Sequence, residues 1–93
     1  MFHVKVCGVT SADDAAMVAA AGADAIGLNF VEGSPRCLTV ERAREVAAAI
    51  PDGVLVVGVF AGTPADEIRR IAAAVPLDAV QLHGLLAGDG VVD

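Results

Sequence analysis

The sequence has only two cysteines, few basic residues and no long apolar run. Two cysteines in 93 residues are too few for a disulfide-stabilised scaffold, so reduced thiols are expected. Six lysines and arginines stand against 12 aspartates and glutamates. The resulting net charge of −6 argues against binding to the phosphates of a nucleic acid.

Membrane insertion is also excluded by what the sequence lacks. The longest uncharged stretch, residues 53–65, has 13 residues interrupted by glycine and proline, whereas a spanning helix needs about 20 apolar residues. The first residues, 1–5, have no apolar core of the length found in a signal peptide. We therefore expect a cytoplasmic protein that does not interact with a membrane.

Apolar side chains, in contrast, are abundant. Hydrophobic residues make up 56% of the chain, and the mean hydropathy is +0.68; both values exclude a disordered polypeptide. The length is that of one small domain, which buries roughly 60–70% of its unfolded surface. The chain is more apolar than such a domain needs. Either the core is unusually rich in apolar side chains, or some of them belong to an interface.

Apolar, β-branched runs alternate with alanine-rich stretches that carry charges at helical spacing. The runs predict buried strands at about 3–8, 24–30, 54–60 and 78–83. The other stretches predict helices over about 12–21, 40–50 and 64–75, with N-caps at Ser11, Thr39 and Thr63. Such alternation is typical of a parallel sheet, either an open doubly wound sheet or part of a (β/α)8 barrel. The tail, 85–93, lacks periodicity and is predicted to be irregular.

Ligands of parallel α/β folds bind at the carboxyl ends of the strands, where several reactive side chains gather in this sequence. Cys7 ends the first run and is either a base or nucleophile, or a small buried side chain. His83 ends the fourth run and is either an acid–base group or a structural histidine. Arg36, in a loop, either clamps a carboxylate or phosphate or stays solvated. Cys37 is the weaker thiol candidate.

No cysteine or histidine cluster with metal-ligand spacing and no glycine-rich phosphate loop occurs in the sequence. The residues by themselves therefore indicate neither a metal site nor a phosphate-binding loop.

Five segments together resemble one family. They are residues 5–10 (KVCGVT), 22–30 (GADAIGLNF), 34–36 (SPR), 57–60 (VGVF) and 80–84 (VQLHG). In this order and spacing they are similar to phosphoribosylanthranilate isomerase, an enzyme family of tryptophan biosynthesis. The resemblance implies a (β/α)8 barrel. It also implies an Amadori rearrangement of N-(5-phosphoribosyl)anthranilate to 1-(2-carboxyphenylamino)-1-deoxyribulose 5-phosphate, without cofactor or metal.

The same resemblance implies a role for each of three side chains. Cys7 would be the general base that removes the C2′ proton of the opened sugar imine. Arg36 would hold the anthranilate end of the substrate, and His83 would line the site and orient the substrate.

The resemblance covers only about the first half of the family's barrel. The family's general acid, an aspartate after the fifth strand, and its phosphate-binding loops have no counterpart here, and residues 85–86 are leucines where the family usually has an acid. We therefore predict an α/β half-barrel over residues 1–84, with four parallel strands and three helices, that is inactive alone. One alternative is a non-catalytic half-barrel module or truncated product that self-associates through open edges or pairs with a second half. Another is a flavodoxin-like domain.

Overall fold

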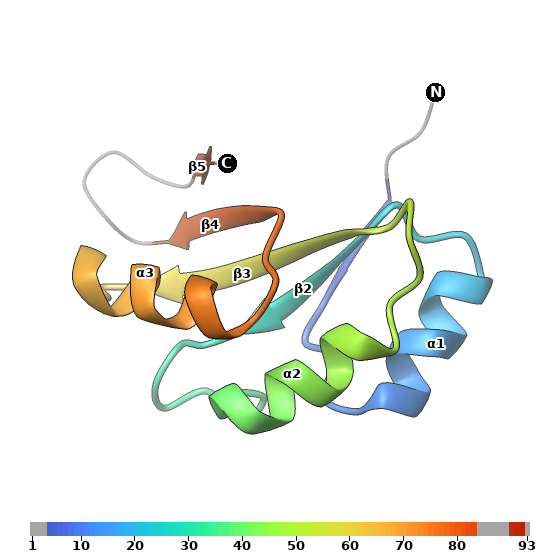
Figure 1. Cartoon of the computed structure of the whole chain (residues 1–93), viewed down its shortest axis with the longest axis horizontal. Helices are drawn as coiled ribbons and strands as arrows, with labels where there is room; N and C mark the ends of the chain where they lie inside the picture. The colour runs from blue at the N-terminus through green and yellow to red at the C-terminus, as the bar shows by residue number, and fades with distance from the viewer. Residues whose placement is uncertain (1–3, 84–89, 93) are drawn as a thin grey trace.

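Strands and helices alternate along the chain in a computed structural model, which describes residues 4–83 and 90–92 (Figure 1). The elements are β1 (Lys5–Cys7), α1 (Ala12–Ala20), β2 (Ala25–Asn29), α2 (Val40–Ala48), β3 (Leu55–Ala61), α3 (Ala65–Ala74), β4 (Ala79–His83) and β5 (Gly90–Val92). They form one sheet in the order β1-β2-β3-β4-β5, in which the first four strands are parallel. The predicted fold class, with four parallel strands and three helices, is confirmed. Among the described residues, no helix is both long and apolar enough to cross a membrane.

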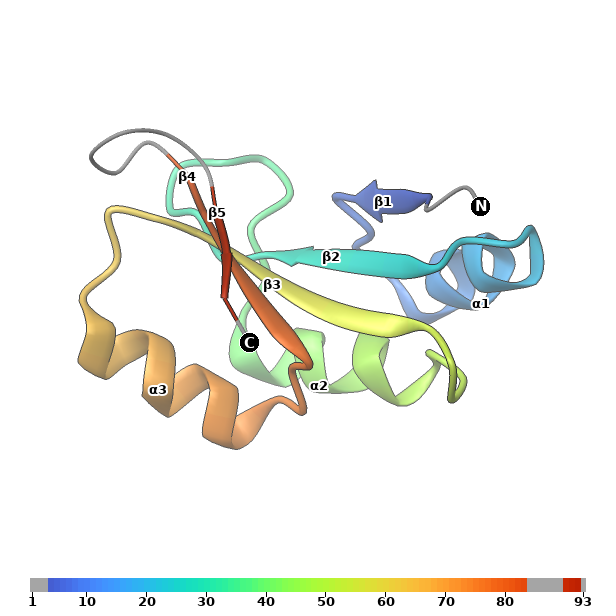
Figure 2. The same ribbon diagram turned by 90° about the horizontal axis from the view of Figure 1, so that it is seen from above.

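The three helices cover one face of the sheet, and the hydrophobic core lies between them and the strands (Figure 1). Ile26, Leu28 and Phe60 project into this core and are fully buried. The ring of Phe60 stacks on that of Phe30 with 5.1 Å between centroids. Because side chains alternate along a strand, the neighbouring strand residues lie on the opposite face, which none of the helices in the described residues covers. Figure 2 shows this face from above.

Two aspartates tie the amino ends of the strands together. Asp24 Oδ2 accepts a hydrogen bond from the backbone N of Val4 at 2.9 Å, next to the start of β1. Asp78 Oδ2 accepts one from the backbone N of Val56 at 2.8 Å, in β3. Both carboxylates therefore join neighbouring strands at the edge of the sheet opposite to the carboxyl ends.

Two of the three predicted helix caps are present. Ser11 Oγ accepts from the backbone N of Asp14 at 3.1 Å, and Thr39 Oγ1 accepts from the backbone N of Arg42 at 3.1 Å. The predicted cap at Thr63 is wrong: α3 begins after Pro64, which makes no side-chain capping bond. Because Pro64 holds the cap position, Thr63 lies one residue before it, and its hydroxyl instead donates to the carbonyl of Ala61 at 3.4 Å.

Thr39→Ala is expected to lower the free energy of unfolding by about 1 kcal/mol, because the first turn of α2 loses its side-chain acceptor. Thr63→Ala is the matched control and is expected to change it by less than about 0.5 kcal/mol, since no helix donor bonds to this hydroxyl. Urea unfolding of both variants measures the difference. Equal losses would contradict the assignment of the caps.

The end of the chain differs from the prediction of an irregular tail. Residues 85–89 and 93 lie outside the described residues, but Gly90–Val92 forms β5. This strand runs antiparallel to β4, with Val92 opposite Val80 and Gly90 opposite Leu82. The prediction that both edges of the half-barrel are open is therefore wrong for β4, because a segment beyond it returns and takes up its free backbone groups. Within the described residues, the outer edge of β1 has no strand partner.

Candidate active site

Cys7 occupies the last position of β1, and its side chain is exposed on the face of the sheet without helices. Its register partner on β2 is Gly27. A methyl group on Gly27 would lie 2.7 Å from Cys7 Sγ, closer than two such atoms can approach. The thiol therefore rests directly over the glycine, and the absence of a side chain at this point of β2 is what makes room for it.

Arg36 comes from the loop between β2 and α2, and its side chain lies against Gly8, the residue that follows Cys7. Gly8 has a φ of 80°, which a glycine adopts without strain and which turns the chain sharply after β1. A methyl group on Gly8 would lie 2.9 Å from Arg36 Cδ. The structure thus brings the guanidinium group close to the backbone that carries the thiol, although 29 positions separate the two residues in the sequence.

The loop that presents Arg36 is held by a chain of polar contacts. Asn29 Nδ2, at the end of β2, donates to Ser34 Oγ at 3.2 Å. The same hydroxyl accepts from the backbone N of Arg36, also at 3.2 Å. Asn29 Oδ1 in turn accepts from the backbone N of Val31 at 2.7 Å. Asn29 and Ser34 stand at a strand end and in the adjoining loop, and the sequence did not show that they cooperate to orient Arg36.

His83 is the last residue of β4, where its Cα is paired with that of Ala61 on β3. The side chain of His83 lies outside the part of the chain that the structure describes. Its backbone position nevertheless places it at the carboxyl edge of the parallel strands, the edge at which β1 ends with Cys7. All three predicted site residues thus belong to the same edge of the sheet.

Cys37 does not join them. Its thiol contacts the backbone carbonyl of Leu38, with 3.9 Å from Sγ to the oxygen, and it forms no disulfide with Cys7.

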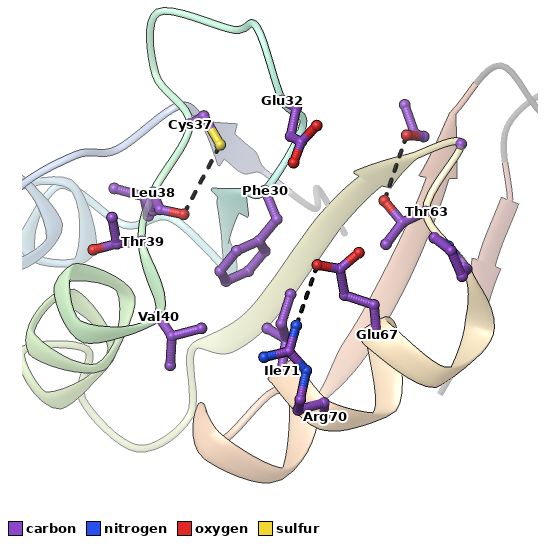
Figure 3. A pocket seen from close by; sticks show the side chains of 13 residues that line it. Phe30, Glu32, Cys37, Leu38, Thr39, Val40, Thr63, Glu67, Arg70 and Ile71 are labelled. Atoms are coloured by element: carbon purple, nitrogen blue, oxygen red, sulfur yellow. Dashed lines mark hydrogen bonds and ion pairs between the residues drawn. The ribbon is translucent and has the colours of Figure 1, made fainter.

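A pocket of about 350 Å³ lies between the start of α2 and the helix α3, and Cys37 is the only one of the candidate residues that lines it (Figure 3). Its floor is apolar and includes Phe30, Leu38 and Ile71. At its rim Arg70 and Glu67 form an ion pair at 3.3 Å (Figure 3). Since neither Cys7 nor Arg36 reaches this pocket, the candidate active site is the open face around Cys7 and not this cavity.

Residues 4–83 and 90–92 contain no evident set of metal ligands. No three histidine, cysteine, aspartate or glutamate side chains lie close enough there to hold a metal ion. That the protein needs no metal or cofactor stays a prediction.

One polar contact on the open face was not predicted from the sequence. Lys5 Nζ, on β1, donates a hydrogen bond to Gln81 Oε1 on β4. The sequence places both residues two positions before a strand end, and this shared spacing is the signal that could have paired them.

Comparison with known proteins decides the family. A family model described as N-(5'phosphoribosyl)anthranilate (PRA) isomerase matches residues 4–90. The chain belongs to this family. The resemblance of the five sequence segments is thereby confirmed.

Relatives from two bacteria show the extent of the match. The N-(5'-phosphoribosyl)anthranilate isomerase of Rubrobacter xylanophilus is 58% identical over 84 residues, which are 90% of this chain and 41% of the relative. That of Neisseria meningitidis serogroup B is 50% identical over 82 residues, or 88% of this chain and 39% of the relative. The chain therefore spans about two fifths of the length of these PRA isomerases.

Solved structures agree with this extent. The chain superimposes on the Thermotoga maritima phosphoribosylanthranilate isomerase with a TM-score of 0.89 and 41% identity, covering 92% of this chain and 42% of that one. It matches equally well, at a TM-score of 0.89, 41% identity and 92% coverage, a PRA isomerase in complex with reduced 1-(o-carboxyphenylamino)-1-deoxyribulose 5-phosphate, of which it covers 44%. The four parallel strands and three helices described above are thus part of a PRA isomerase barrel.

Proposed function

We propose that this chain forms the part of a PRA isomerase that carries the base of an Amadori rearrangement. The observation that supports this best is the exposed thiol of Cys7 over Gly27, with the side chain of Arg36 packed against the adjoining Gly8. The two groups suit a substrate that combines a proton to be removed with a carboxylate to be held.

In the proposed reaction, the Cys7 thiolate removes the C2′ proton from the ring-opened, protonated imine. The electron pair of the broken C–H bond forms a C1′=C2′ double bond, and the electrons of the C=N bond move onto nitrogen. The resulting enolamine becomes the aminoketone when the C2′ hydroxyl loses its proton and C1′ gains one. The acid that opens the sugar ring would come from outside this chain, as the family resemblance implies.

Arg36 would hold the anthranilate carboxylate. One solved relative contains a ligand with a carboxyphenylamino group, and a guanidinium group binds a carboxylate through two parallel hydrogen bonds. Asn29 and Ser34 would keep Arg36 in place through the contacts within its loop. His83, at the same edge of the sheet, would help to orient the substrate.

We also propose a cytoplasmic location, supported by the two free cysteines, Cys7 and Cys37, because reduced thiols are usual in that compartment.

A second candidate function is that of a non-catalytic module that associates with another chain. It is favoured by an apolar groove of about 420 Å³ between α3 and β4, lined by Ile68, Leu77, Val80 and Leu82 among others. These side chains account for part of the unusual apolar content and would pack against a further element. Self-association would use this groove or the outer edge of β1.

The two functions are separated by mixing a polypeptide of these 93 residues with a second polypeptide that carries the rest of the Rubrobacter xylanophilus relative. We expect isomerase turnover from the mixture and none above the uncatalysed rate from either part, because the base and the acid must act on the same bound sugar. Consumption of freshly prepared phosphoribosylanthranilate measures the turnover, and size-exclusion chromatography measures association.

Near-normal turnover by the 93-residue polypeptide alone would contradict the prediction that it is inactive by itself. A stable complex of the two parts without turnover would overturn the proposed isomerase and favour the module. A species larger than the monomer when the 93-residue polypeptide is alone would support self-association.

A further inference from the structure

The contact between Lys5 and Gln81 joins two strands that are not neighbours. The residues are 76 positions apart in the sequence, and β2 and β3 lie between their strands in the sheet. Side chains stand roughly perpendicular to a sheet, and three strand spacings of about 4.8 Å would separate β1 from β4 by roughly 14 Å if the sheet were flat. The contact therefore requires the sheet to curl toward its open face.

The register of the strands shows where the two side chains begin on the open face. On this face, side chains of paired residues form rows across the strands; Lys5 lies in the row of Ala25, and Gln81 lies in the row of Val59, two rows nearer to the carboxyl ends. The row between them contains Cys7, Gly27, Val57 and Ala79. None of these four residues has a long side chain, and the thiol of Cys7 already occupies the space over Gly27. The Lys5 side chain therefore reaches Gln81 across a row of short side chains.

Lys5 and Gln81 also have matching places relative to the proposed site. Lys5 lies two residues before Cys7 on β1, and Gln81 lies two residues before His83 on β4. The hydrogen bond between Lys5 and Gln81 consequently limits how far the backbones of Cys7 and His83 can move apart. The ammonium group makes this a charge-assisted hydrogen bond, which is stronger than one between neutral groups.

We propose that Lys5 and Gln81 are positioning residues, which hold β1 and β4 at the separation that places the backbone positions of Cys7 and His83 on opposite sides of one substrate. This proposal rests on the proposed function, since it assigns the two residues to the same site. Neither is a catalytic residue: they act through the strands that carry the site residues. Lys5 would be needed for the rate of the reaction and not for holding the substrate.

The positioning role is tested first without any enzyme assay. Spin labels are attached at positions 7 and 83 of the 93-residue chain carrying Cys37→Ser and His83→Cys, and the dipolar coupling between them is recorded by electron paramagnetic resonance. We expect Lys5→Met or Gln81→Leu to broaden the distance distribution about twofold, and the double variant to broaden it no further, because both singles remove the same contact.

Lys5→Arg keeps the donor and Gln81→Glu keeps the acceptor. Each of these two variants is expected to retain the narrow distance distribution. Arg69→Met is the control, since this residue pairs with Asp66 on the exposed side of α3. Circular dichroism of each variant shows whether it is folded; if Lys5→Met is not, the comparison is made between Lys5→Arg and Lys5→Gln. An unchanged distribution in the folded variants would overturn the proposal.

The second test uses the mixture with the remainder of the Rubrobacter xylanophilus relative. Lys5→Met is expected to lower kcat on the order of 100-fold, as displacement of a reacting group does, while KM changes less than about threefold. A raised KM with unchanged kcat would overturn the positioning role and make Lys5 a substrate-binding residue. Absence of turnover with the unmodified chain would count against the proposed function alone, because the spin-label result would still decide whether the link positions the strands.

Discussion

Cys7→Ser is expected to lower kcat/KM of the reconstituted isomerase by about 10²–10⁴-fold, the contribution of a positioned general base. A serine hydroxyl has nearly the size of the thiol and fits over Gly27, where even a methyl group from the glycine side would collide with Cys7 Sγ at 2.7 Å. The fold should therefore survive while the group that accepts the proton is lost, since a hydroxyl is a far weaker acid than a thiol.

The matched control for this substitution is Cys37→Ser. Cys37 is the other free thiol, but its sulfur contacts the carbonyl of Leu38 and lies in a different pocket. Its replacement is expected to leave kcat/KM within about twofold, as for a surface substitution away from the site. Steady-state turnover of the mixture measures both variants. A similar loss for Cys37→Ser, or no loss for Cys7→Ser, would remove the assignment of Cys7 as the base.

Gly8→Ala is expected to reduce turnover of the mixture on the order of 100-fold, because it displaces Arg36 and strains the turn next to Cys7. The added methyl group would lie 2.9 Å from Arg36 Cδ and 3.1 Å from Arg36 Nη1. The φ of 80° also disfavours any residue with a side chain, at a cost of about 1–2 kcal/mol.

Gly22→Ala separates these two effects. Gly22 follows α1 with a φ of 104°, and a methyl group there would meet no atom within 4 Å. It should destabilise the chain by a similar 1–2 kcal/mol and leave turnover at saturating concentrations of the second part unchanged. Urea unfolding and turnover of both variants are compared. Equal effects on turnover would mean that Gly8 contributes through stability alone and that its contact with Arg36 has no part in the site.

Local signals predicted most of the elements. The strand β3 follows from an apolar run, and α2 follows from the cap at Thr39 and the charges after it. Both signals act between residues close in the sequence, so they survive in almost any tertiary environment. The predicted cap at Thr63 failed although its signal was also local: a threonine before a proline has the composition of a cap, but the Thr63 hydroxyl bonds to the carbonyl of Ala61 instead.

The candidate site was proposed from strand ends and residue types. Cys7 and His83 were chosen because a parallel sheet gathers the carboxyl ends of its strands at one edge, which is a property of the fold class. Arg36 was chosen for its residue type and its loop. That its side chain packs on Gly8 depends on the path of the whole loop through Asn29 and Ser34, and no local pattern specifies such a path.

The amino-acid sequence alone determined the alternation of strands and helices, the edge at which reactive residues collect and the family to which the chain belongs. Only the tertiary structure decided that Lys5 reaches Gln81 across two strands and that Gly90–Val92 returns as an antiparallel strand on β4. The physical reason is the sequence separation over which each kind of interaction acts. Backbone periodicity and capping involve neighbours a few positions apart, whereas sheet curvature and edge pairing depend on how the whole set of strands packs.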